Sequence, residues 1–268
     1  MKIGGVLVGL VVLAALLSFI WTPYDPLVVS AGERLLGPTG EHVFGTDKFG
    51  RDVASQIMVG ARTTLYVGVV AVGVAAVIGT PLGILAGMSR RWLGEFIMRV
   101  NDLVLAFPAL LLAILFGAVF GADTLTAMIA IGIATVPSFA RIARSGTLRV
   151  MNTEYVLAAR AAGRSKWHIA VRHVFPNISG LLIVQSSVSF AIAVLAEAAL
   201  SFLGFGTRPP TPSWGRMLQE SQELLAVQPR LALVPGIAIA IAVLGFNLLG
   251  DGLRDRFDPK LEVRRVAG

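Results

Sequence analysis

The sequence has no cysteine and few charged residues, and each shortage excludes a class of protein. Without cysteine there is no disulfide framework and no thiolate metal site. Charged residues make up 15% of the chain, whereas soluble domains carry about a quarter. A surface in contact with water needs charge and a surface in contact with lipid excludes it. The composition, with a mean hydropathy of +0.77, therefore predicts a membrane protein.

Patterns for nucleotide or metal chemistry are also missing. The glycines between Gly45 and Arg51 do not form a phosphate-binding loop, because Arg51 and Asp52 stand where Lys and Ser or Thr would hold phosphate and Mg²⁺. The three histidines show no metal-ligand spacing. We therefore expect no catalytic residue, metal site or cofactor on this chain, and no enzymatic activity. The net charge of +7 predicts loops that face anionic membrane lipid rather than a nucleic-acid partner.

Six long apolar runs predict an all-α, polytopic membrane protein with six transmembrane helices. About 20 residues at 1.5 Å per residue cross a hydrocarbon core of roughly 30 Å, and each run is close to that length. The first run is read as a retained helix because no small-residue cleavage site follows it. The runs are Ile3–Trp21, Thr64–Gly87, Leu103–Ala122, Thr124–Ala140, Ile178–Ala196 and Leu231–Gly250.

The distribution of lysine and arginine predicts the orientation. If both termini are cytoplasmic, the inner segments hold 16 of the 23 basic residues and the outer segments hold 7. Inner loops carry the excess of basic residues, so we expect a multi-pass protein of the bacterial inner membrane with both termini inside. Three parts follow from this topology: residues 1–63 (first helix and outer segment), 64–250 (core bundle, with the cytoplasmic loop 141–177) and 251–268 (cytoplasmic tail).

The loop 141–177 carries the most specific local pattern. Asn152 or Thr153 can cap a helix that runs through Ala162, and Gly163 suits the position just past its end. Ser165 can cap a second short helix from Lys166 to about Val174, with Pro176 breaking the pattern where the fifth span opens. Trp167, Val171 and Val174 share one apolar stripe on this basic helix. Such a helix can adsorb to anionic lipid, pack on its own bundle, or seat Trp167 in a cytoplasmic partner.

Two further residues stand out. Glu197 is the one carboxylate inside an apolar run, which predicts either a structural hydrogen bond to a neighbouring element or a place on a translocation path. Trp214 follows a segment stiffened by three prolines. It can anchor the chain at the membrane interface, or the loop around it can serve as a gate or dock an external protein.

At the loop the chain resembles a known family. The loop resembles the "EAA" loop of ABC importer permeases, which is written Glu-Ala-Ala, three residues, Gly, nine residues, Ile-x-Leu-Pro. The matching residues are Ala158, Ala159, Gly163 and Pro176. Leu157, His173 and Phe175 depart from the usual Glu, Ile and Leu. The segments that narrow the resemblance to the C-type permease of the dipeptide/oligopeptide/nickel family are Phe44–Asp52, Ala196–Gly204, Pro210–Gly215 and Gly250–Asp255 with Asp258-Pro-Lys260.

The resemblance implies a type I ABC importer permease that takes up di- or oligopeptides or a related small solute. It implies as partners a second homologous permease, two ATPase subunits that carry ATP and Mg²⁺, and an extracytoplasmic substrate-binding protein. The alternatives are nickel or another solute within the same family, or an ion-gradient-driven secondary transporter, which would need paired intramembrane charges. The residues expected to couple to the ATPase are Ala158, Ala159, Gly163, Ser165, Lys166, Trp167, Ala170, Val171 and Pro176.

Overall fold

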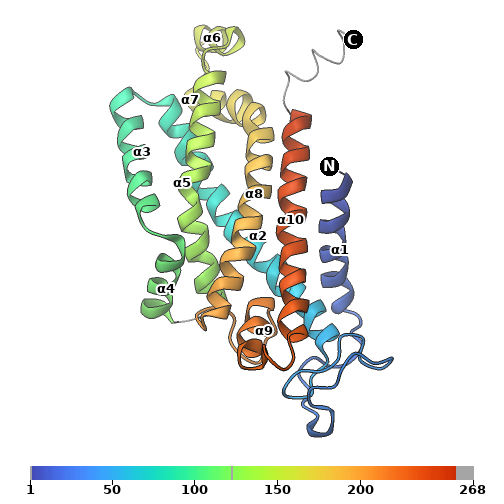
Figure 1. Ribbon diagram of the computed structural model, residues 1–268. Coiled ribbons are helices and arrows are strands. Elements are labelled where there is room, and N and C mark those ends of the chain that lie inside the picture. Colours follow the sequence, from blue (N-terminus) through green and yellow to red (C-terminus); the bar gives the residue numbers. More distant parts are fainter. Residues whose placement is uncertain (1, 122, 258–268) are drawn as a thin grey trace.

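The fold is a bundle of helices, as the apolar runs predict (Figure 1). A computed structural model describes residues 2–121 and 123–257, and within these ranges it contains no strand. Most of the predicted spans therefore become helices, with bounds that differ from the apolar runs. The α-helices are α1 (Lys2–Ser18), α2 (Val53–Met88), α3 (Arg91–Ala106), α4 (Ala109–Phe120), α5 (Thr124–Val150), α6 (Glu154–Ala161), α7 (Lys166–Ile169), α8 (Phe175–Phe202), α9 (Trp214–Ser221) and α10 (Arg230–Phe257).

Four helices are long and apolar enough to cross a membrane: α2, α5, α10, and the continuous helix formed by α7, the π-helical segment η2 (Ala170–Val174) and α8. The bent pair α3 and α4 makes a fifth, broken span. The apolar helix α1 has 17 residues, which is about 25 Å at 1.5 Å per residue. If the bent pair is counted as one span, five of the six predicted spans are long enough to cross a membrane. That α1 is the sixth span stays a prediction.

The third predicted span, Leu103–Ala122, is wrong as a single helix. Helix α3 ends at Ala106, and α4 starts at Ala109 at an angle of 82° to it. The break lies at Phe107-Pro108, because proline lacks the N–H that a helix needs and pushes the residue before it out of the helical region. Phe107 accordingly has an extended backbone, with ψ of 126°. Ala122 lies outside the described residues.

Small residues let the central helices approach closely. A Cβ atom on Gly79 of α2 would lie 2.6 Å from the carbonyl oxygen of Val136 on α5, and one on Gly83 would lie 2.3 Å from that of Ala140. A Cβ on Gly4 of α1 would similarly meet α10, 2.5 Å from the backbone nitrogen of Leu249. These approaches bring backbones together in the way that small residues do in membrane helix pairs. The bundle therefore has α2, α5 and α8 at its centre and α1 with α10 along one side (Figure 1).

The two ends of the bundle differ. The start of α1, the end of α10 and the helices α6 and α7 lie at one end, which we call the α6 end (Figure 1). The segment between α1 and α2 and helix α9 lie at the other, the α9 end. The predicted boundaries at 63/64 and 250/251 both fall inside helices, since α2 starts at Val53 and α10 runs to Phe257. Residues 258–268 of the predicted tail lie outside the described residues.

Candidate functional site

The loop residues predicted to bind a partner form a hairpin of helices, residues 153–174, at the α6 end. Thr153 stands at the N-cap of α6, and Gly163 follows the helix with φ of +73°, a conformation that glycine adopts without steric cost. The Arg164 N–H donates to the Ala159 carbonyl at 3.1 Å, which closes the end of α6 in a Schellman motif. Ser165 caps α7 by accepting from the His168 N–H at 3.2 Å. The predicted helix, glycine corner and second helix are all present.

The apolar stripe predicted on the second helix is partly exposed and partly buried. Trp167 is 78% exposed, and Val171 is also exposed, whereas Val174 is buried. Ile169, which the stripe did not include, is buried with Val156 of α6 in a cluster that anchors the hairpin to the bundle. The sequence did not reveal this anchor, because Ile169 lies off the stripe of Trp167, Val171 and Val174 and its burial depends on distant parts of the chain. The structure therefore leaves Trp167 free on the surface while other apolar residues hold the hairpin.

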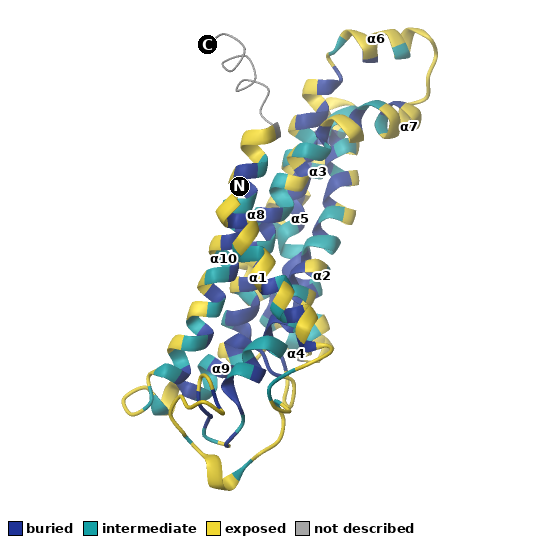
Figure 2. Ribbon diagram, turned by 90° about the vertical axis from the view of Figure 1, so that its right-hand side faces the viewer, coloured by how far each residue is buried: buried dark blue, intermediate teal, exposed yellow. Residues whose placement is uncertain are grey.

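The remaining predicted coupling residues lie together on the same projecting hairpin, which Figure 2 shows largely exposed. Aromatic contacts tie its two arms: the Tyr155 ring of α6 lies 6.0 Å from the His173 ring of η2, and His168 lies 6.0 Å from His173. The residues that share this surface are Ala158, Ala159, Gly163, Ser165, Lys166, Ala170, Val171 and Pro176, of which Ala159 and Ala170 are partly covered and the others exposed.

The predicted break at Pro176 is wrong. The chain passes from α7 through the π-helical η2 into α8 without interruption, so Lys166–Phe202 is one helical body. Pro176 is tolerated because it stands in the first turn of α8, and the π-helical turn before it shifts the hydrogen-bond pattern by one residue. The exposed helix carrying Trp167 is thus the end of a membrane helix rather than a separate element.

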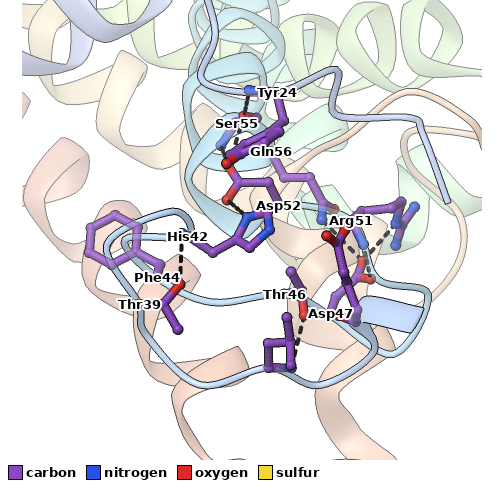
Figure 3. A network of polar contacts seen from close by, with 12 residues as sticks. Tyr24, Thr39, His42, Phe44, Thr46, Asp47, Arg51, Asp52, Ser55 and Gln56 are labelled. Carbon is purple, nitrogen blue, oxygen red and sulfur yellow. Dashed lines mark hydrogen bonds and ion pairs between the residues drawn. The ribbon is translucent and has the colours of Figure 1, made fainter. Parts of the chain in front are cut away.

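At the α9 end, a buried polar network holds the segment before α2 (Figure 3). Asp52 caps α2 by accepting from the Ser55 N–H at 2.7 Å and from the Ser55 hydroxyl at 2.8 Å. Its other oxygen lies 2.9 Å from His42 Nδ1, and the His42 and Asp52 side chains are both buried. The His42 ring also packs on Tyr24, 4.5 Å between centroids. The network joins residues ten or more positions apart, a pairing that the sequence did not predict.

A second set of ion pairs ties this segment to α9. Asp47 accepts from Arg51 Nε at 2.6 Å and from Gln56 Nε2 at 3.0 Å. Arg51 also pairs with Glu220 of α9, and Glu220 pairs with Arg216 at 2.9 Å. We call residues 22–52 together with α9 the cap. Several of its charged side chains are paired inside the chain, which makes this part of the cap a structured covering of this end.

Trp214 lies in the interior between the cap and α2. The indole is 2% exposed, and its Nε1–H donates to the Ile57 carbonyl at 3.0 Å. A Cβ on Gly60 would lie 2.6 Å from the ring, so a glycine is needed beneath it. The ring therefore holds α9 to α2 and is not a surface anchor. Docking of an external protein at the loop before it, residues 208–213, stays a prediction.

Glu197 is buried in α8 near the α9 end, with 3% exposure. Its carboxylate accepts from the Ser201 hydroxyl at 2.6 Å and from the Thr207 hydroxyl at 3.3 Å. The Ser201 hydroxyl also accepts from the Thr207 N–H at 3.0 Å, which closes the turn after α8. These contacts support the structural interpretation of Glu197. A place on a translocation path stays an untested alternative.

Helices that are long and apolar enough to cross a membrane, one of which ends in a projecting helical hairpin, give the chain the architecture of a polytopic membrane protein. Its residues 79–263 match the family model described as "Binding-protein-dependent transport system inner membrane component". The chain belongs to this family. That membership favours ATP-driven import over the ion-gradient alternative and makes the protein an integral membrane component.

Individual relatives and solved structures agree. The chain is 42% identical to the dipeptide transport system permease protein DppC of Alkalihalophilus pseudofirmus, over 97% of this chain and 86% of the relative. It is 40% identical to the glutathione transport system permease protein GsiD of Pectobacterium atrosepticum, over 95% and 86%. The inward-facing MetNI methionine ABC transporter matches with a TM-score of 0.63 at 17% identity, over 76% of this chain and 96% of that chain. That likeness shows the fold, the type I importer permease fold.

Proposed function

We propose that this chain and a second, homologous permease together form the translocation path of an ATP-driven importer for di- or oligopeptides, or for a related small solute such as glutathione. The names of the relatives support this substrate class, since those proteins carry dipeptides and glutathione. The observation that carries the coupling role is the projecting hairpin with Trp167 exposed at its turn. A large aromatic side chain left uncovered on a rigid helix is typical of an anchor for a partner's pocket.

The hairpin lies in the cytoplasm in this proposal, with both termini on the same side. The start of α1, the end of α10 and the hairpin share one end of the bundle (Figure 1). That end also carries the larger share of the arginine and lysine residues, as cytoplasmic segments do. The cap then lies outside the inner membrane, where a substrate-binding protein delivers its solute.

Two ATPase subunits bind the hairpins in this proposal, and they hold the ATP and Mg²⁺. The hairpin continues into α8 without a break, so closure of the ATPases on ATP pushes directly on a membrane helix. Hydrolysis then resets the pair of permeases. The chain itself provides a surface that the ATPases bind and performs no chemistry on the nucleotide.

The external binding protein docks on the cap in this proposal. A groove of about 620 Å³ lies there, lined by Tyr24, Arg62 and the proline-rich residues 210–212 among others. The cap is stiffened by its internal ion pairs, so a docked protein meets a preformed surface.

The test is a double substitution, Trp167→Ala with Ala170→Glu, in the transporter expressed with its own ATPases. It removes the exposed anchor and adds a charge beside it, so the ATPase recovered with the purified permease should fall at least about thirtyfold, as loss of an interface anchor worth about 2 kcal/mol predicts. Membrane insertion should be unchanged, because Trp167 makes little contact within the chain. Trp21→Ala, an exposed tryptophan at the other end, is the matched control.

Normal recovery of ATPase with the double variant would contradict the coupling role of the hairpin. The substrate class has a separate readout, which is uptake of labelled dipeptide and of labelled glutathione into proteoliposomes that hold the complete transporter and its binding protein. Uptake of neither compound, with ATPase binding intact, would overturn the peptide assignment and leave the coupling role standing.

A further inference from the structure

We infer that the charged face along which α3 meets α5, at the α6 end, binds the headgroup of an anionic phospholipid. The inference rests on the orientation proposed above, in which this end lies at the inner leaflet. Figure 1 shows α3 at the edge of the bundle, packed beside α5. The residues of α3 divide into three rows along its length, and each row has a different chemistry.

The first row of α3 is packed against the bundle. Gly94, Met98 and Asn101, spaced four and three residues apart, are the buried residues of this helix. A Cβ on Gly94 would lie 2.5 Å from the carbonyl oxygen of Ala86 on α2, so this face is closed against the protein. The row fixes how α3 is rotated, and with it the direction of the other two rows.

The second row points away from the bundle and is apolar. Trp92, Phe96, Val100 and Leu103 are all exposed in the described part of the chain, with Trp92 and Leu103 at 67%. Their spacing of four, four and three residues places them on one face. Such a face suits acyl chains, and the tryptophan at its α6 end suits the membrane interface.

The third row lies between these two and is charged. Arg91, Glu95 and Arg99 follow at intervals of four residues, and Arg91 Nε donates to Glu95 Oε1 at 2.8 Å. Further along, Asp102 accepts from Arg141 Nη2 of α5 at 2.6 Å, which shows that this row faces α5. Arg144 stands three residues beyond Arg141, so the two arginines lie on the same side of α5. The charged face therefore brings together four arginines and two carboxylates.

The excess positive charge on this face has the chemistry of a phosphate site. All basic residues of α3 and α5 are arginines, and guanidinium groups bind phosphate in a forked geometry that lysine cannot match. The Nε of Arg144 is buried and has no hydrogen-bond partner among the described residues. Basic pockets between membrane helices on the cytoplasmic side bind anionic headgroups in other proteins. A phosphate above the arginines would direct its acyl chains along the apolar row.

The experiment measures lipid binding to the complete purified transporter by native mass spectrometry, with phosphatidylglycerol, cardiolipin and phosphatidylcholine as probes. The native protein should retain the two anionic lipids in preference to phosphatidylcholine. Arg99→Gln with Arg144→Gln should weaken anionic lipid binding about twenty-fivefold, about fivefold for each arginine. The control, Arg254→Gln with Arg256→Gln, makes the same charge change on α10, also at the α6 end of the bundle, and should leave binding unchanged.

A second measurement locates the site. Brominated phosphatidylglycerol should quench the tryptophan fluorescence of the transporter more than brominated phosphatidylcholine does, and Trp92→Phe should abolish that difference. Three results would overturn the inference: equal binding of the anionic and neutral lipids, equal losses in both double variants, or no lipid on α3 because the second permease covers it. Normal ATPase recovery with the Arg99/Arg144 variant would show that such a failure leaves the proposed transport function intact.

Discussion

The cap and the hairpin stand at opposite ends of the same helices and are built in opposite ways. In the cap, several polar and charged side chains are buried or half-buried in contact with one another, as Asp52 is with His42 and Arg51 with Asp47. In the hairpin, Trp167 and Lys166 are exposed, and the interior contacts come from a few apolar residues such as Ile169. One end is completed by the chain itself. The other has the form of an element that a partner completes.

The difference has an energetic cause. Buried charges are costly unless they are paired, so the cap keeps its shape only while every pair is present. The hairpin depends on local caps, on the Gly163 corner and on a few buried apolar residues such as Ile169, so its exposed side chains carry little of its stability. We therefore expect substitutions in the cap to reduce the stability of the chain, and substitutions on the hairpin surface to change partner binding and leave stability unchanged.

Asp52→Ala should have the largest effect on stability. It leaves His42 Nδ1 and the Ser55 hydroxyl without their buried partner and removes the cap of α2, so the free energy of unfolding should fall by about 3–6 kcal/mol, which combines two unpaired buried polar groups with a lost helix cap. Thermal unfolding of the purified transporter in detergent measures the loss. Asp52→Asn keeps a capping oxygen and should lose roughly 1 kcal/mol less. A melting temperature equal to that of the native protein would show that the network does not hold the cap.

The two tryptophans give the next largest contrast. Trp214→Ala should destabilise the chain by about 3–5 kcal/mol, because it empties a packed site and removes the hydrogen bond to the Ile57 carbonyl. Trp167→Ala should change stability by less than about 0.5 kcal/mol, because the ring is exposed. Unfolding temperatures of the two variants, measured side by side, test the comparison. Similar losses in both would mean that the hairpin is as tightly integrated as the cap.

Gly163→Ala should have a small effect, about 1 kcal/mol, because a Cβ at that site meets no neighbouring atom and the cost is only that of a positive φ. The loss should appear as weaker recovery of the ATPase, by less than about tenfold, with the unfolding temperature nearly unchanged. Gly45→Ala in the cap is the contrast, since its Cβ would lie 2.3 Å from the Leu36 carbonyl oxygen. Equal unfolding temperatures for these two variants would remove the distinction between the ends.

The sequence predicted those features that depend on neighbouring residues. Thr153, Gly163 and Ser165 mark the ends of α6 and the start of α7 because caps and corners are made by residues a few positions apart. The apolar runs likewise predicted the membrane helices. Pro108 permits a bend in the run 103–122, but the 82° break between α3 and α4 was not predictable, because hydropathy averages over a window and the run is apolar throughout.

Features that depend on distant residues were not predictable in this way. The burial of Trp214 requires Gly60, and the pair of Arg51 with Glu220 joins positions that only the fold brings together. The continuity of α7 with α8 was missed because Pro176 reads as a break, while the π-helical turn that accommodates it has no local sequence signal. Recognition of the family came from several short motifs in order, none of which showed where its residues lie.

The uninterrupted helix Lys166–Phe202 has a mechanical consequence. A hinge between the hairpin and the membrane would absorb a rotation, and this helix has none along its 37 residues. A rotation applied around Trp167 is therefore transmitted along the whole length of α8. The turn of chain after α8, where Glu197 holds Ser201 and Thr207, would receive that motion at the far side of the membrane.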